Sequence, residues 1–305
     1  KHLNVVSRVN QTLNFFANRS RCNATPKLWE LDVKQDSRDL FEIRITRTET
    51  KDGYERHINT TYIKSSSMQG DSTKSSVPHR IFHPTLQKFF VHSIWFHDVL
   101  VDSSFLSHCT KFVAAQKLRT LTLCDMHYHD GTQKKLFMNW ILASSIPMLS
   151  LAGSEFHEIV NDDFIKELAQ NTPNPSLRVP YVASPDEDLP TLERATSDAL
   201  SLYRHVYFGH LQVDADWIME PIIKRLCRNM MGTWALEFTR DPTADDVKAV
   251  IDHNFEFESF EFDDVWDEHC TEHRITMRSN KEIFVKIQFS NYRGVGIYFF
   301  GARAD

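Results

Sequence analysis

An apolar–any–apolar triplet recurs along the chain and organises its pattern of hydrophobic and polar positions. The first residues of successive triplets are about 24–30 residues apart. That period is typical of repeat proteins in which one supersecondary unit stacks on the next. The triplets begin at Ile94, Leu121, Leu149, Leu177, Val206, Leu236 and Phe260. Since a polar turn and a helix-like segment follow most of them, the pattern predicts an α/β solenoid of strand–helix units over residues 86–305.

In a layered strand–helix unit, one face of each strand packs against the unit's own helix. The outer members of each triplet are therefore expected in the core, and the middle members on the opposite, open face of the sheet. Residues suited to N-capping precede the helix-like segments: Asp102, Asp130, Asn161, Asp214 and Thr243. Helical spacing gives the inward residues as Phe105, Phe112, Leu136, Trp140, Phe164, Leu168, Trp217, Ile223, Val247 and Ile251. Pro221 is expected to kink or interrupt its helix.

Two smaller β elements flank the predicted units. Residues 28–66 alternate apolar and polar positions, which predicts an antiparallel β meander. Residues 282–289 and 295–300 predict a hairpin that caps the other end, as solenoids require. The predicted organisation is a helix at 1–22, a small antiparallel sheet at 23–66, a Ser-rich linker at 67–85 and a solenoid with its terminal hairpin at 86–305.

The first residues give a more specific indication. Residues 3–19 have apolar positions at helical spacing, include Val6-Ser7-Arg8 and precede a short basic stretch at 18–21. This segment resembles the last helix of an F-box, and the triplets resemble a divergent leucine-rich repeat of the helix-bearing class. The order of the parts is similar to that of F-box substrate adaptors, including the large divergent F-box families of nematodes. The resemblance implies a substrate-recognition subunit of a cullin-type ubiquitin ligase, which an upstream F-box would join to the ligase's linker subunit.

The triplets depart from the leucine-rich repeat at one defined position. That repeat usually has Asn three residues past the second apolar residue of the strand, where the Asn satisfies the backbone of a turn. This chain has Val99, Met126, Ser154, Leu211, Asp241 and Val265 at those places. The turn must therefore be built in another way.

Composition narrows the class of protein. The chain has 305 residues, of which 41% are hydrophobic and 25% charged, as is usual for globular proteins. Its formal charge of −6 argues against general nucleic-acid binding, which usually needs a basic face. The sequence shows neither an apolar run of about 18 residues nor the core of a signal peptide, so no membrane association is expected. The five cysteines form no C-x-x-C pair, which favours reduced thiols in the cytoplasm or nucleus, and the four Asn-x-Ser/Thr sequons are interpreted as chance matches.

One stretch suggests catalysis instead of binding. Asp125, His127 and His129 alternate directly after a predicted strand, and this spacing puts two imidazoles on one side of an extended chain, within reach of one metal ion. Metal-dependent hydrolases of amidohydrolase type present histidines in this way. Such a barrel needs more strand–helix units and more ligands than the sequence offers. His269 and His273 have metal-compatible spacing only in a helix, with no evident third ligand. The hydrolase is the alternative hypothesis.

The middle residues of the triplets form the principal candidate site. They are Trp95, Thr122, Ser150, Arg178, Tyr207, Glu237 and Glu261. Trp, Tyr and Arg are enriched at interaction hot spots, and the strand face of a solenoid is commonly its binding surface. An aromatic and Arg half followed by an acidic half suits a basic or amphipathic partner segment. The sequence therefore predicts a non-enzymatic, cofactor-free solenoid that binds another protein along its strand face.

Overall fold

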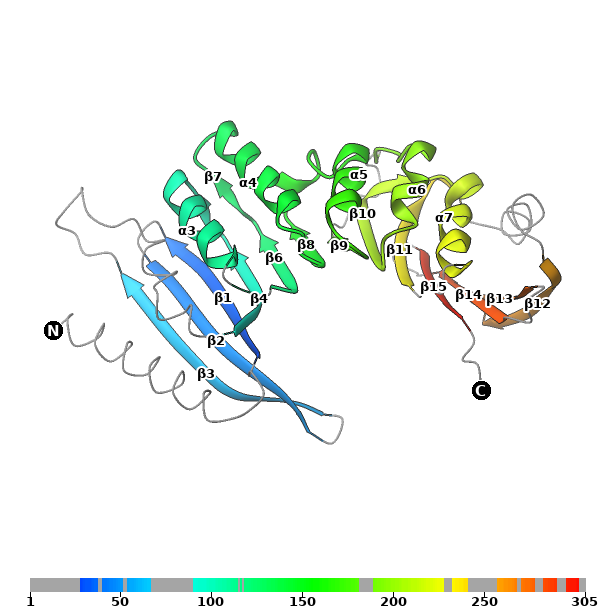
Figure 1. Ribbon diagram of the computed structural model, residues 1–305, viewed down its shortest axis with the longest axis horizontal. Helices are drawn as coiled ribbons and strands as arrows, with labels where there is room; N and C mark the ends of the chain where they lie inside the picture. Colours follow the sequence, from blue (N-terminus) through cyan, green and yellow to red (C-terminus); the bar gives the residue numbers. More distant parts are fainter. Residues whose placement is uncertain are drawn as a thin grey trace. The chain divides into compact units, whose positions relative to one another are not determined.

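The computed structural model describes part of the chain, and all structural statements concern that part (Figure 1). The described ranges are 28–37, 40–51, 54–66, 90–114, 116, 118–180, 189–227, 232–240, 257–267, 270–277, 282–289 and 295–301. They form a mixed α/β fold in which most strand–helix units contribute parallel strands. The chain divides into two compact units, Lys1–Ile146 and Pro147–Asp305, so the division falls inside the range predicted as one solenoid. The F-box-like helix at 1–22, the linker at 67–85 and the helix predicted after Thr243 lie outside the described residues.

The sheet of the first unit joins an antiparallel meander to parallel strands. Its order is β6–β4–β1–β2–β3, with β1 antiparallel to β2, β2 antiparallel to β3, and β4 parallel to both β1 and β6. The strands are β1 (Leu28–Ser37), β2 (Leu40–Lys51), β3 (Tyr54–Ser66), β4 (Phe90–His97) and β6 (Thr120–Cys124). A separate parallel pair consists of β5 (Leu100–Val101) and β7 (His127–Tyr128). The meander predicted for residues 28–66 is confirmed.

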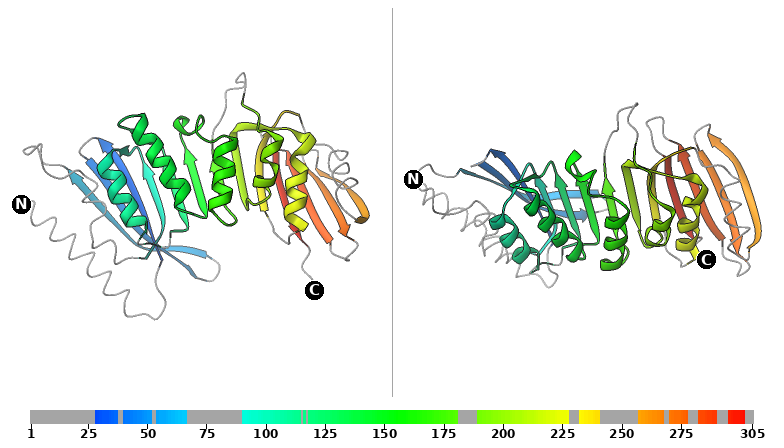
Figure 2. Two further views of the ribbon diagram at one scale, coloured as in Figure 1. Left: turned by 45° about the horizontal axis from the view of Figure 1, so that its top comes forward. Right: turned by 90° about the horizontal axis from the view of Figure 1, so that it is seen from above.

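Two helices, α3 (Ser103–Ala114) and α4 (Gly131–Ala143), lie on one side of β4 and β6 (Figure 1 and Figure 2). Both begin at the expected caps, since Asp102 accepts from the Phe105 N–H and Asp130 from the Gln133 N–H. The rings of Phe96 and Phe105 are 5.2 Å apart at their centroids, and those of Phe105 and Phe137 are 6.2 Å apart. Each of these buried side chains stabilises the unit by about 1.5–3 kcal/mol.

The inward face of α4 differs from the prediction. Leu136 is 47% exposed and Trp140 is only partly buried, whereas Phe137, Met138 and Ile141 are buried. The segment is apolar at several consecutive positions, so two helix phases bury similar areas. The local pattern does not decide between these two helix phases. The contact between Phe137 and the Phe105 ring of α3 decides it.

The sheet of the second unit has a parallel half and an antiparallel half. Its order is β8–β9–β10–β11–β15–β14–β13–β12, with parallel pairing from β8 to β11 and antiparallel pairing from β11 to β12. The strands are β8 (Met148–Ala152), β9 (Ser176–Val179), β10 (His205–Val213), β11 (Gly232–Phe238), β12 (Phe257–Asp267), β13 (Cys270–Met277), β14 (Glu282–Phe289) and β15 (Val295–Gly301). The predicted terminal hairpin is confirmed as β14 and β15.

The last predicted triplet is not another parallel repeat strand. Phe260 to Phe262 lie in β12, which three antiparallel strands separate from β11. The prediction was wrong because a local apolar–any–apolar pattern specifies a strand but not its neighbour or its direction.

The helices of the second unit follow the prediction less closely. They are the short turns η2 (Ser154–Phe156) and η3 (Arg194–Thr196), and the helices α5 (Asp162–Asn171), α6 (Ser197–Leu200) and α7 (Ala215–Cys227). Asn161 caps α5 by accepting from the Phe164 N–H. Before Tyr203 the chain forms only a single turn of helix, α6, and Pro221 does not interrupt α7, which continues through it.

A residue with positive φ follows the strand in several strand–helix units. Asp98 after β4 and Asp125 after β6 have φ values of 55° and 50°, and Gly153 after β8 has 138°. Each stands two residues past the second apolar member of its triplet, and Val99 and Met126 directly after the two aspartates are buried. These residues bend the chain one residue before the position at which a leucine-rich repeat has Asn. Asp tolerates this conformation better than most side chains because it is short and polar.

Burial of the triplets agrees with the predicted facing. The outer members of the triplets in β4, β6, β8, β9 and β10 are at most 2% exposed, for example Ile94, Phe96, Leu149 and Leu151. In the second unit the core also contains Tyr203, whose hydroxyl donates to the Ile165 carbonyl at 2.8 Å. Among the helices of the described ranges, none combines the length and apolar character needed to cross a bilayer.

Candidate functional site

The principal candidate site lies on the outer face of the first unit, defined as the face of its sheet opposite α3 and α4. Strand alternation places Glu30, Asp32 and Lys34 of β1 on this face, because Trp29, Leu31 and Val33 between them are buried. The register with β4 sets Asp32 beside Trp95 and Lys34 beside His97. Outer residues of neighbouring strands therefore form rows across the sheet.

In these rows, residues of opposite charge stand opposite one another on β1 and β2. Asp32 is opposite Arg44, and Lys34 is opposite Glu42. Such cross-strand pairs each contribute roughly 0.2–1 kcal/mol. Both charged rows lie on the face of the sheet that is turned away from the core.

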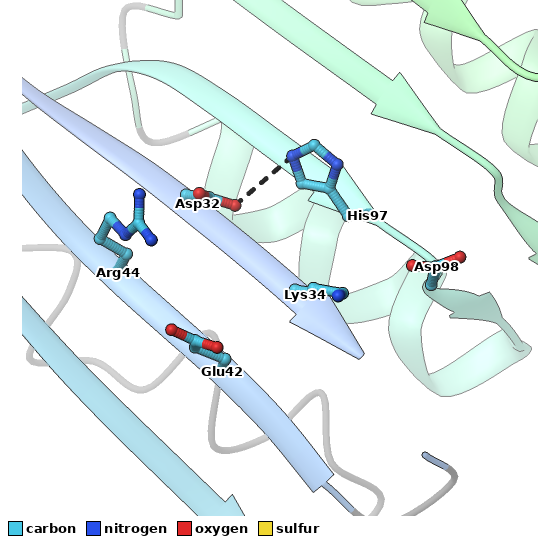
Figure 3. Close-up of a pocket in the computed structure, with 6 residues that line it drawn as sticks. All are labelled: Asp32, Lys34, Glu42, Arg44, His97 and Asp98. Carbon is cyan, nitrogen blue, oxygen red and sulfur yellow. Dashed lines mark ion pairs between the residues drawn. The ribbon is translucent and has the colours of Figure 1, made fainter. Parts of the chain in front are cut away.

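A charged hollow of about 280 Å³ lies between these rows (Figure 3). It is lined by Asp32, Lys34, Glu42, Arg44, His97 and Asp98. Asp98 is the positive-φ residue at the end of β4, so the turn that bends the chain also supplies a carboxylate to the hollow. Sequence reasoning missed the residues of β1 and β2. The only available signal was the charge alternation of two strands whose mutual register is set by the fold.

Trp95 is the most prominent apolar side chain beside the hollow. It is 43% exposed, yet its ring is held at two places. Its Nε1–H donates to Ser93 Oγ at 3.2 Å, and its ring stacks with His97 at a centroid distance of 6.0 Å and an interplanar angle of 29°. An exposed aromatic side chain fixed in this way loses little conformational freedom when a partner binds.

Two carboxylate–histidine pairs flank Trp95. His97 Nε2 is 3.6 Å from Asp32 Oδ1, and His92 Nε2 is 3.9 Å from Glu30 Oε1. Nδ1 of His92 also lies 2.9 Å from the Trp29 carbonyl oxygen, which fixes that ring. Each carboxylate is about one-third exposed, so it is available to a partner from solvent.

Thr122 was predicted as a neighbour of Trp95 in the binding row, and the register does place the two side by side. Its side chain is only 7% exposed. Thr122 therefore supports the row without offering a contact surface.

The second unit has its own outer face, opposite α5 and α7, and the predicted row is partly present there. Ser150 is paired with Arg178, and Arg178 with Tyr207. The Arg178 guanidinium lies over the Tyr207 ring at 5.3 Å, and Tyr207 is 38% exposed. On the same strand, burial and the nearby Arg204 lower the pKa of His205.

The acidic half of the predicted row is displaced. Ala235, not Glu237, is opposite Tyr207, because the register aligns Trp234 and Leu236, two residues earlier than the predicted triplet, with Val206 and Phe208. A bulge in β10 between Phe208 and Gln212 then sets Glu237 opposite Gln212. Glu261 lies in β12 opposite Arg274, far from β11 in strand order, and its side chain lies outside the described residues. The prediction of one row from Trp95 to Glu261 is therefore wrong at its acidic end.

The histidines of the alternative hypothesis are exposed. His127 lies in β7, and His129 Nδ1 is 3.4 Å from Asp130 Oδ2, while the hydrogen bond from the Gln133 N–H lowers the pKa of Asp130. Within the described ranges, no three potential ligands of a metal ion come together. His273 lies in strand β13, not in the helix that this spacing requires, and His269 lies outside the described residues. In neither unit does the strand order of the described residues close into a barrel.

Comparison with known proteins adds no candidate. A search of family models finds no match to this chain, and searches of curated proteins and of solved structures find none either. The two outer faces described above therefore give the main indications of function.

Proposed function

We propose that this chain is a non-enzymatic protein-binding module that holds its partner on the outer faces of its sheet strands. The observation that supports this most directly is Trp95, which is large, exposed and held in one orientation. Buried aromatic anchors dominate the affinity of protein interfaces, and Trp, Tyr and Arg are the residue types most often found among them. Trp95 is of this type, and the Arg178–Tyr207 pair is a second example in the other unit.

The distribution of exposed apolar side chains also favours binding by the strands. The large hydrophobic residues that are exposed in the described part are Phe90, Trp95, Leu136, Met148 and Tyr207. All except Leu136 lie on strands, and Leu136 lies on α4. A helix-covered sheet that exposes its apolar side chains on the uncovered face presents a surface suited to another protein.

The hollow itself suits a protein segment better than a small molecule. Small-molecule pockets are usually lined by apolar and aromatic side chains with a few polar groups. The lining here consists of charged residues and one histidine. Charged groups at the rim of an interface direct association and register.

The finer form of the proposal is a substrate-recognition subunit of a cullin-type ubiquitin ligase, acting in the cytoplasm or nucleus and built as a leucine-rich-repeat-like solenoid. The support comes from the sequence, where an F-box-like helix at 1–22 precedes a short sheet and repeated triplets. The recurrence of Asp98, Asp125 and Gly153 with positive φ after successive repeat strands agrees with a repeated turn.

The test of the binding function compares Trp95→Ala with Leu136→Ala in the full-length protein. The two side chains are similarly exposed, but only Trp95 lies on the outer face. Proteins captured from cells by the wild type and by Leu136→Ala should be lost from Trp95→Ala, with melting temperatures unchanged within a few degrees. Capture of the same proteins by all three variants would refute binding at this face.

The adaptor role has a separate readout. The full-length protein should co-purify with a linker subunit and a cullin, and Trp95→Ala should retain both while losing the captured substrates. Recovery of substrates without linker or cullin would leave the binding function and remove the ligase role.

A further inference from the structure

We propose that the partner segment presents an arginine side chain to the outer face of the first unit, with its guanidinium on the Trp95 indole and against the Asp32 carboxylate. This inference rests on the proposed binding function and names the chemistry that Trp95 recognises. The two groups are direct neighbours in the register of β1 and β4. A cation therefore meets an aromatic face and a carboxylate at one place.

The indole is arranged for this contact before any partner arrives. The hydrogen bond to Ser93 Oγ holds the edge of the ring and the stacking with His97 holds its plane, while 43% of the residue stays in solvent. Trp is the aromatic residue that attracts a cation most strongly, because its face has the most negative potential. The same potential repels a carboxylate or phosphate, so the ring selects against acidic partners.

The carboxylates beside Trp95 can accept a stronger partner than they now have. Asp32 and Glu30 lie 3.6 Å and 3.9 Å from His97 and His92. Charge-assisted hydrogen bonds are shorter, about 2.7–2.9 Å. A histidine is charged only when protonated, whereas a guanidinium is always charged. An incoming arginine therefore competes with His97 for Asp32 and forms the better pair.

The cationic side chains already on this face do not remove its preference for a basic partner. Lys34 and Arg44 stand opposite Glu42 and Asp32 in the register of β1 and β2, so these two cations are matched in number by two carboxylates. Glu30 and Asp98 add two further negative charges, on the β1 side of Trp95 and at the end of β4. Excess negative charge around an exposed indole favours a basic segment.

Arginine fits this place better than lysine. Its planar guanidinium stacks on an indole and can still donate two parallel hydrogen bonds to a carboxylate. An ammonium group is compact and more strongly hydrated, so it gains less from the ring. We therefore expect arginine to be selected over lysine.

The test begins with a random peptide library displayed on phage and selected on the wild-type protein after depletion on Trp95→Leu. The selected peptides should share an arginine. A fluorescein-labelled selected peptide is then titrated by fluorescence polarisation, together with the same peptide in which citrulline replaces that arginine. Citrulline keeps the shape of the side chain and removes its charge. The citrulline peptide should bind about tenfold more weakly, and Trp95→Leu and Asp32→Asn should each weaken the arginine peptide by about five- to thirtyfold.

Controls separate recognition from folding. Leu136→Ala should bind both peptides as the wild type does, and Trp95→Phe, which retains a ring, should bind with intermediate affinity. In Trp95→Leu the difference in affinity between the arginine and citrulline peptides should become smaller, because the indole that contacts the guanidinium is absent. The citrulline comparison on wild-type protein does not depend on how any variant folds.

Each other outcome overturns a defined statement. Peptides that require Trp95 but share no arginine, or that bind equally well with citrulline, would refute the arginine inference and leave the binding function. Failure to select any peptide that depends on Trp95 would refute both.

Discussion

The stability of the second unit should depend on the protonation of one buried histidine. His210 lies in the bulge of β10, is 2% exposed and has its ring stacked against that of His157 at 5.2 Å. Its Nε2 lies 3.1 Å from the Val160 carbonyl oxygen, which can only accept, so Nε2 is the protonated nitrogen. Nδ1 is buried and has no hydrogen-bond partner among the described residues. A second proton would therefore place a charge in a site that cannot solvate it.

The size of this effect on the unfolding free energy follows from the pKa of His210. Burial is the main cause that lowers the pKa of His210 to about 4; the bond to Val160 opposes this shift, and the nearby His157 adds a smaller lowering. An unfolded histidine has a pKa of about 6.5. Above pH 6.5 both states are neutral and His210 adds no pH dependence. As the pH falls from about 6.5 to 4, the unfolded state gains the proton first, so the unfolding free energy falls by about 1.4 kcal/mol per pH unit, or roughly 2.5 kcal/mol at pH 4.5.

The assay is urea denaturation of the full protein at several pH values between 7.5 and 4.5. His210→Gln can still donate a hydrogen bond to Val160 but cannot be protonated, so its unfolding free energy should fall by about 2.5 kcal/mol less than that of the wild type over this range. His127→Gln removes an exposed histidine and should follow the wild-type curve. Parallel pH profiles for His210→Gln and wild type would mean that His210 is not the buried neutral group described here.

Other predictions test the turns, the facing of the strands and the absence of metal chemistry. Asp125 has a φ of 50°, so Asp125→Gly should leave the unfolding free energy unchanged or raise it by up to about 1 kcal/mol, whereas Asp125→Val should lower it by about 1–2 kcal/mol. Leu151 is buried and Ser150 lies on the other face of β8, so urea denaturation should show a loss of about 3 kcal/mol or more for Leu151→Asp and less than about 1 kcal/mol for Ser150→Asp. Equal losses would contradict the assignment of faces. Elemental analysis should find no stoichiometric divalent metal, and a metal lost on His127→Ala would make the hydrolase the better hypothesis.

Local patterns predicted the features that depend on neighbouring residues. The outer triplet residues Ile94 and Phe96 are buried and Trp95 between them is exposed, because alternation along a strand is a local property. Asp102 and Asn161 cap their helices for a similar reason, since a cap needs only the next three residues. These elements were predictable because no distant partner decides them.

Features that depend on distant neighbours were not predictable. The phase of α4 is set by the packing of Phe137 on Phe105, and the residue opposite Tyr207 is set by the register between β10 and β11. The charged hollow needs the register that brings Arg44 opposite Asp32. The leucine-rich-repeat pattern has its turn residue three residues past the triplet, whereas Asp98 forms the turn two residues past it. In each case the missing information was a tertiary contact or a backbone angle, not a residue type.

The position of β15 in the second sheet determines the order in which this unit can form during synthesis. β15 pairs on one side with β11 and on the other with β14, although it follows both in the chain. Until Val295–Gly301 has left the ribosome, β11 and β14 each expose an unpaired edge. Exposed edges are prone to pair with other chains. Both edges of the nascent unit therefore stay unpaired until the strand that joins its halves is made, and an intermediate of this kind is prone to aggregate.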